Sequence, residues 1–126
     1  MIQIKRLKKS LMSAWRGIIY VYRSEQNFRI HVGVGLGVIF FAVWVKVTPI
    51  EAALLSFSIF GVLILEIVNT IFERTGDMLK PRIHDYVKYI KDLSSAAVLL
   101  AVLVSMIVGV TVLGPYFINL LNYPLK

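Results

Sequence analysis

The sequence predicts an all-α integral membrane protein, in which an N-terminal amphipathic helix lies on the membrane surface and three further helices cross the bilayer. The first observation is the composition: 58% of the residues are hydrophobic and the mean hydropathy is +0.77, so the bilayer is the expected solvent. The second is the distribution of charge, because seven of the fourteen Lys and Arg residues precede residue 30 and five more lie between Arg74 and Lys91. Basic residues confined to alternate loops indicate the cytoplasmic side of a membrane protein. The net charge of +7 therefore favours a membrane surface, and not nucleic acid, as its partner.

Residues 1–27 are predicted to form the surface helix. Apolar side chains recur at every third or fourth position along one face and basic side chains lie opposite, which is typical of a helix in the membrane interface. The apolar face consists of Ile4, Leu7, Leu11, Trp15, Ile18 and Tyr22, and the basic face of Lys5, Lys9, Arg16 and Arg23. Glu25 falls on the apolar face. It can be interpreted as a solvated end residue, as a salt-bridge partner of Arg29 one turn later, or as a functional carboxylate. The residues alone leave these alternatives open.

Residues 28–47 are predicted to form the first span. Their charge-free part is shorter than the ~20 residues usually needed, so the charged residues at its two ends are expected to snorkel toward the interfaces. Gly33 and Gly37 are four residues apart and are expected to allow close helix packing. His31, at the membrane edge, is expected to be a hydrogen-bonded structural residue and not a metal ligand.

Residues 50–78 are predicted to form the second span, antiparallel to the first because only a tight turn around Pro49 separates them. At ~100° per residue, one narrow polar stripe runs along this helix from within the membrane to its edge. The stripe consists of Glu66, Asn69, Glu73 and Asp77. An ionisable group at membrane depth costs at least ~2.5 kcal/mol, so the stripe indicates a functional site. Gly76 and Pro81 are expected to weaken the helix at its basic end.

Residues 79–91 are predicted to form a polar cytoplasmic loop, and residues 92–121 the third span. The distribution of positive charge places the N-terminus on the same, cytoplasmic side as this loop and the C-terminus outside. The third span begins with small residues, Ser94 to Ala97, which suit close packing against another helix. Residues 1–126 are thus expected to form a single membrane domain.

The candidate functional groups gather at one membrane surface. Glu25, the polar stripe, Lys91 and Asp92 supply several oxygen ligands and the chain has no cysteine, a combination that suits Mg²⁺ bound through carboxylates and substrate phosphates. Lys91 can pair with phosphate as a point charge, and Glu66, the deepest carboxylate, suits a general base acting on a hydroxyl presented from the lipid side. The residues alone therefore predict a site for metal, protons or phosphate. A phosphotransferase, a small proton-coupled membrane carrier using Glu66 and a non-catalytic scaffold remain open.

Three motifs resemble the prokaryotic diacylglycerol kinase family, which includes the undecaprenol kinases. Glu66-Ile-Val-Asn-Thr-Ile-Phe-Glu73, followed by Asp77, resembles the family signature Glu-Ile-Leu-Asn-x-Ala-Ile-Glu-x-x-x-Asp. Lys91-Asp92-Leu-Ser-Ser-Ala-Ala-Val98 resembles its Lys-Asp-x-x-x-Ala-Val block at the right distance. Ser24-Glu25-Gln-Asn-Phe-Arg-Ile-His31 resembles the segment before its first span. The resemblance covers about residues 6–108.

The resemblance implies a lipid kinase of the bacterial inner membrane, a homotrimer with shared active sites that uses ATP and Mg²⁺ to phosphorylate diacylglycerol or undecaprenol. It implies that Glu66 and Asn69 are catalytic, and that Glu25 and Glu73 bind the metal. It further implies that ATP contacts Ser13, Glu25, Glu73, Asp77, Arg82, Ile83, His84, Lys91 and Asp92, and that the lipid substrate contacts Arg6, Glu66 and Ser95. The acceptor stays open, because Asn27 and His31 resemble the undecaprenol kinase branch whereas Ser94–Val98 resembles the diacylglycerol kinase branch.

Three positions depart from the family pattern. Ser13 stands where some members have a tyrosine that contacts nucleotide. Arg74 stands where an apolar residue is common and places an extra cation near the expected phosphates. Pro81 lies in the loop that is expected to close over ATP. None of these departures removes a group that phosphoryl transfer needs.

Overall fold

The computed structural model describes residues 4–79 and 84–122, which form four α-helices. Helix α1 spans Ile4–Ser24, α2 spans Gln26–Val45, α3 spans Pro49–Leu79 and α4 spans His84–Asn122. Three of them, α2, α3 and α4, are long and apolar enough to cross a membrane. The prediction of an all-α chain with three candidate membrane spans is therefore confirmed. The interfacial position of α1 and the homotrimer stay predictions.

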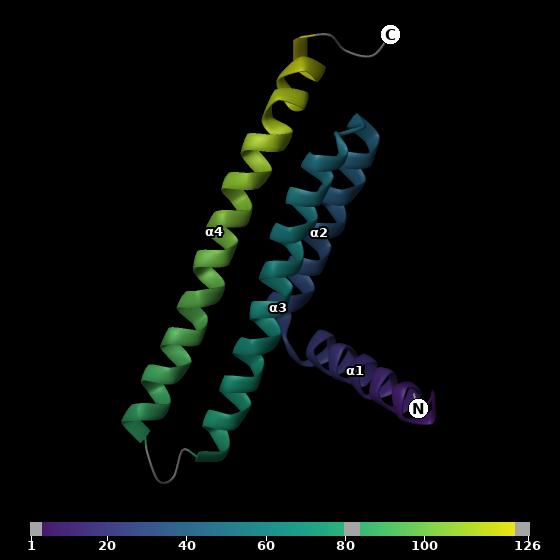
Figure 1. Ribbon diagram of the computed structural model, residues 1–126. Coiled ribbons are helices and arrows are strands. Elements are labelled where there is room, and N and C mark those ends of the chain that lie inside the picture. Colours follow the sequence, from purple (N-terminus) through teal and green to yellow (C-terminus); the bar gives the residue numbers. More distant parts are fainter. Residues whose placement is uncertain (1–3, 80–83, 123–126) are drawn as a thin grey trace.

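Helix α3 is the centre of the arrangement, because it packs against both α2 and α4 (Figure 1). The chain turns sharply at Glu25, whose backbone is extended (φ −108°, ψ 119°), and α1 points away from the three long helices (Figure 1). The α3–α4 pair continues past this junction (Figure 1). The polar end of α3 therefore lies beside the point at which α1 leaves the bundle.

The opposite end of α3 is fixed by a capping box. Lys46 ends α2 in the left-handed conformation (φ 56°), and Thr48 precedes the first residue of α3. The backbone N–H and the hydroxyl of Thr48 both donate to Glu51 Oε2 at 2.8 Å, and the Glu51 N–H donates back to the hydroxyl at 3.4 Å. The phenol of Tyr116 on α4 donates to the same Glu51 oxygen at 2.8 Å. This cluster joins the α2–α3 turn to α4.

The close contact between α2 and α3 involves Gly35, which lies between the two glycines expected to allow close packing. A Cβ at Gly35 would lie 2.8 Å from Ile59 Cγ2, so α2 approaches α3 at this point. Gly33 and Gly37 have no neighbouring side chain within 4 Å of a Cβ position in the described part of the chain, so they mediate no close packing within it, and packing against another subunit stays a prediction. The four-residue spacing indicates the two glycines that flank Gly35, but the orientation of α2 turns Gly35 itself toward its neighbour.

The connection between α3 and α4 is shorter than the predicted loop 79–91. Helix α3 continues through Gly76 to Leu79, and α4 begins at His84. The side chain of Val87, which is only 4% exposed, explains both features, because a Cβ at Gly76 would lie 2.9 Å from Val87 Cγ1. Gly76 does not end the helix. It allows α4 to approach α3, and this packing stabilises the helical form of a polar segment.

Candidate active site

The deepest polar contact of the site joins Glu66 on α3 to His31 on α2. The side chain of Glu66 is 4% exposed, and its Oε1 lies 3.2 Å from His31 Nε2, within hydrogen-bond distance. A buried carboxylate requires such a partner, since an unsatisfied one is costly in an apolar environment. The expectation that His31 is hydrogen-bonded agrees with this contact, but the sequence did not indicate that its partner would be the central carboxylate of the stripe.

A second contact continues the stripe toward its exposed end. The side-chain amide of Asn69 donates to Glu73 Oε1 at 3.2 Å, one turn further along α3. The hydroxyl of Ser94 on α4 donates to Asn69 Oδ1 at 2.7 Å. Ser94 is buried, whereas the predicted substrate residue Ser95 is exposed. Sequence reasoning missed Ser94, although it directly precedes Ser95 in the Lys-Asp block.

The third contact lies at the exposed end of the stripe. Lys91 Nζ donates to Asp77 Oδ1 at 3.0 Å, and this ion pair joins α4 to α3. Both side chains reach solvent, with Asp77 45% and Lys91 26% exposed. Asp92, the next residue of the predicted nucleotide set, is exposed on α4. A lysine ammonium at this position can leave a surface carboxylate for a phosphate, because a surface pair contributes little to stability.

The junction between α1 and α2 brings a further carboxylate to α3. Glu25 Oε1 accepts a hydrogen bond from Arg74 Nη2 at 2.8 Å, and this ion pair spans 49 positions in the sequence. The alternative that Glu25 pairs with Arg29 is wrong. The Arg29 guanidinium instead donates to the backbone carbonyls of Tyr22 and Arg23, at 3.2 and 3.1 Å.

Arg6 and Ser13, two further predicted site residues, are not gathered with the stripe. Arg6 and Ser13 are exposed on α1, which points away from the long helices (Figure 1), and the Ser13 hydroxyl accepts from Arg16 at 3.2 Å. Arg82 and Ile83 lie outside the described residues. His84 opens α4, but its side chain also lies outside the described part.

The donor set fits Mg²⁺ only together with substrate. Within residues 4–79 and 84–122, no group of three or more His, Asp or Glu side chains could hold a metal ion. Mg²⁺ does not require such a cage, since it is commonly bound by one or two carboxylates plus substrate phosphates and water. Glu25 and Glu73, the predicted ligands, are two hard oxygen donors of this kind. Their chemistry therefore fits a metal that arrives with a phosphate-bearing ligand.

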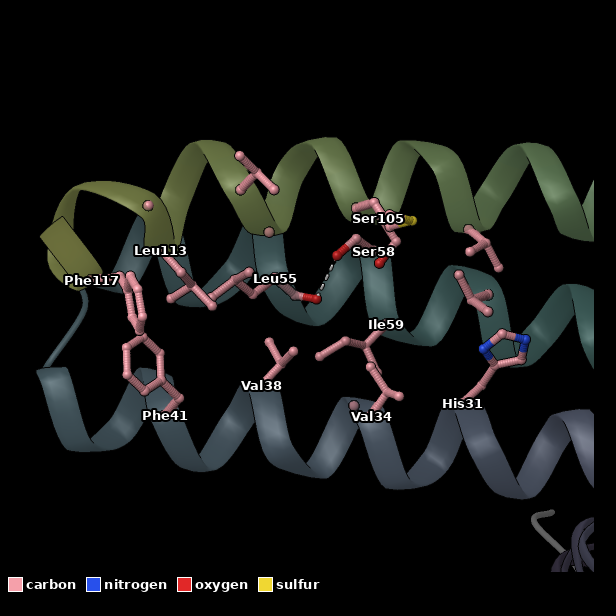
Figure 2. A pocket seen from close by; sticks show the side chains of 17 residues that line it. His31, Val34, Val38, Phe41, Leu55, Ser58, Ile59, Ser105, Leu113 and Phe117 are labelled. Atoms are coloured by element: carbon pink, nitrogen blue, oxygen red, sulfur yellow. Dashed lines mark hydrogen bonds between the residues drawn. The ribbon is translucent and has the colours of Figure 1, made fainter.

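An apolar groove extends from the partly exposed His31 along the membrane-spanning helices. It has a volume of about 470 Å³ and is lined by α2, α3 and α4. Figure 2 shows His31 at one end and Phe41 and Phe117 at the other. The hydroxyls of Ser58 and Ser105 are the other polar side-chain groups of its lining. The groove therefore offers a hydrocarbon surface that ends next to the His31–Glu66 contact.

Comparison with known proteins identifies the family. The family model for prokaryotic diacylglycerol kinase matches residues 12–113. The chain is 35% identical over 113 residues to a diacylglycerol kinase of Synechocystis sp., covering 89% of this chain and 65% of that relative, so it spans about two thirds of that protein's length. It is 31% identical over 113 residues to the undecaprenol kinase of Bacillus subtilis, covering 90% of this chain and 92% of the relative. It is 31% identical over 112 residues to a diacylglycerol kinase of Escherichia coli, covering 89% and 92%. The resemblance stated from the motifs is confirmed: the chain belongs to the prokaryotic diacylglycerol kinase family.

Proposed function

We propose that this protein is an ATP- and Mg²⁺-dependent lipid kinase, which transfers the γ-phosphate of ATP to the hydroxyl of a membrane lipid. The observation that carries the proposal is that the carboxylates along α3 change from buried to exposed. Glu66 is buried against His31 at the end of an apolar groove, while Glu73 and Asp77 continue the same stripe toward solvent. One helix therefore joins a surface suited to a lipid with a surface suited to a soluble phosphate donor.

In the proposed reaction, Glu66 acts as the general base. Its carboxylate accepts the proton of the lipid hydroxyl as the hydroxyl oxygen bonds to the γ-phosphorus. The bond between that phosphorus and the oxygen bridging to the β-phosphate breaks, so the products are the phosphorylated lipid and ADP. The contact with His31 supports this role because it fixes one carboxylate oxygen. Asn69 supports the geometry from the next turn, since it is held between Glu73 and Ser94.

The nucleotide is proposed to bind at the exposed end of the stripe. Glu25 and Glu73 would hold Mg²⁺, which when bound would neutralise charge on the phosphate oxygens. Lys91 would exchange its pairing with Asp77 for a phosphate oxygen. Asp92, the residues 82–84 and Ser13 would complete the contacts to ATP. The absence of a three-carboxylate cage in the described residues is compatible with this arrangement, because the phosphates would supply the remaining ligands.

The acceptor is proposed to be diacylglycerol, giving phosphatidic acid, or undecaprenol, giving undecaprenyl phosphate. Support comes from the names of the relatives, which include both a diacylglycerol kinase and an undecaprenol kinase at similar identity. The groove between the spanning helices supports either lipid, since its lining is apolar apart from His31 and two serines. Arg6 and Ser95 are proposed to contact the lipid near its hydroxyl.

The topology and assembly are also proposed. The N-terminus and the α3–α4 connection would lie on the cytoplasmic side of a bacterial inner membrane, with the C-terminus outside, because the basic residues gather on the former side. The active form would be a homotrimer with active sites shared between subunits. Sharing would explain why Arg6 and Ser13 lie on a helix that points away from its own long helices (Figure 1).

The test is an assay of the purified protein with radiolabelled ATP, in which diacylglycerol, undecaprenol and ceramide are offered in parallel. We expect label in one of the first two lipids, only when Mg²⁺ is present. Label in none of the three lipids, from intact oligomers, would contradict the kinase proposal. The proton-coupled carrier is tested in the same preparation by reconstitution into vesicles, where proton movement dependent on Glu66 but independent of ATP would favour it.

A further inference from the structure

Arg74 lies next to the proposed metal ligand Glu25, but it has no role in the reaction proposed above. Its guanidinium lies 2.8 Å from Glu25 and 5.9 Å from the centre of the Tyr20 ring. The Arg74 side chain is 51% exposed and lines the groove between α1 and α3, so it has room to change its rotamer. Arg74 is also one of the positions at which this sequence departs from the family pattern.

The partner of Arg74 is the carboxylate that is proposed to bind the metal. Oxygens that bind Mg²⁺ lie about 2.0–2.1 Å from it, so a metal on Glu25 would lie within a few ångströms of the guanidinium at its present place. Two cations so close repel one another unless anionic oxygens lie between them. Arg74 and a metal would therefore compete for the carboxylate of Glu25, unless phosphate oxygens lay between the two cations.

The chemistry of the guanidinium indicates where it would go. Arginine donates two parallel hydrogen bonds to phosphate oxygens, and it favours this geometry more than lysine does. Arg74 faces the α1 side of α3, whereas Lys91 approaches the stripe from α4. A polyphosphate on the metal would thus meet one cation from each side.

We propose that Arg74 binds the outer phosphates of the nucleotide and that it exchanges Glu25 for them when the magnesium nucleotide binds. Before binding, the guanidinium neutralises the carboxylate of Glu25. On binding, it moves to the phosphates, and Glu25 becomes available to the metal. This inference rests on the proposed function, because it requires a nucleotide site at Glu25. A permanent structural ion pair is the competing interpretation, in which Arg74 holds the α1–α2 junction on α3 in every state.

The experiment measures equilibrium binding, by isothermal titration calorimetry of the full chain in detergent micelles. The probes are the magnesium complex of the non-hydrolysable β,γ-imido analogue of ATP, and AMP, which lacks the two outer phosphates. For Arg74→Gln we expect the affinity for the analogue to fall about tenfold or more and the affinity for AMP to stay unchanged. Arg74→Lys should lie between wild type and Arg74→Gln. Arg23→Gln, which removes an exposed cation from α1, is the matched control and should bind both probes as wild type does.

A second measurement keeps the inference testable if Arg74→Gln does not assemble. In the presence of EDTA, Glu25→Gln should bind the metal-free analogue more tightly than wild type, because its arginine is no longer held by a carboxylate. Equal loss of both probes in Arg74→Gln, or unchanged binding of the metal-free analogue in Glu25→Gln, would overturn the role of Arg74 and leave the proposed nucleotide site standing. Failure of the wild type to bind the magnesium analogue would instead overturn the proposed nucleotide site.

Discussion

Two clusters of carboxylates lie at opposite ends of α3, and the groups that bind those carboxylates differ in kind. At the start of the helix, Glu51 Oε2 accepts hydrogen bonds from the Thr48 N–H, the Thr48 hydroxyl and the Tyr116 phenol, each at 2.8 Å. These donors are neutral, and two of them belong to the same turn. Such a cluster is satisfied by the fold itself and needs no ligand.

At the other end, the carboxylates are held by groups that can be exchanged. Glu25 is paired with Arg74 and Asp77 with Lys91, in ion pairs that reach solvent. Both cations can bind phosphate oxygens in place of a carboxylate. This difference shows that a carboxylate joining two helices is not by itself a ligand-binding site. The groups that bind the carboxylate distinguish a structural contact from one at which a ligand can replace the partner. Substitutions at the two ends of α3 test this distinction.

The largest expected effect is that of Glu66→Gln. Loss of the general base should lower kcat by roughly 10²- to 10⁴-fold, while the oligomer still assembles and still binds the magnesium ATP analogue. Glu51→Gln is the matched control, since it makes the same change on the same helix in the cluster that is closed by neutral donors. Turnover of Glu66→Gln close to that of wild type would rule out Glu66 as the base.

The next effect concerns the metal. Glu25→Ala or Glu73→Ala should raise the Mg²⁺ concentration that gives half-maximal activity by about tenfold or more, because each removes one hard oxygen ligand. The measurement is a Mg²⁺ titration of the initial rate at saturating ATP and lipid. If both variants respond to Mg²⁺ as wild type does, neither carboxylate holds the metal.

A smaller loss of kcat than that of Glu66→Gln is expected at His31, which is proposed to position Glu66. His31→Leu removes the polar partner of a buried carboxylate and should lower kcat by about 10- to 100-fold, with little change in the KM for ATP. His31→Gln keeps a side-chain donor and should recover part of that loss. A drop in kcat that is equal for Leu and Gln would show that the contact at 3.2 Å does not orient the base.

The helices could be predicted from the sequence because long apolar runs and basic loops carry a strong signal. The contacts between helices could not, since they depend on how each helix rotates about its axis. Gly33 and Gly37 have the expected spacing, yet Gly35 makes the contact, with Ile59. Helix α4 begins in a segment expected to be a loop, because Val87 packs on Gly76.

In the candidate site too, features within one helix could be predicted from the sequence and contacts between helices could not. The stripe on α3 needed only the periodicity of one helix, so Glu66 and Asn69 could be identified by their positions. His31, Ser94 and Arg74 come from contacts between elements, and no spacing within one helix predicts them. The capping box is an exception, because Thr48 followed by Glu51 three residues later is a sequence signature of a helix start.

The smallest effect on activity is expected at the cluster of Glu51, Thr48 and Tyr116, whose hydrogen bonds come from neutral donors. Tyr116→Phe removes the hydrogen bond from α4 to Glu51, so it should leave turnover within about twofold of wild type. It should lower the melting temperature by a few degrees, whereas Tyr86→Phe, at an exposed tyrosine of the same helix, should not. Because Tyr116 and Glu51 share one contact, the double variant Glu51→Gln, Tyr116→Phe should be less destabilised than the sum of the two single variants. A large loss of turnover in Tyr116→Phe at full stability would mean that the Glu51 end of α3 affects catalysis. The distinction between a structural cluster at that end and a ligand-exchanging cluster at the other would then be wrong.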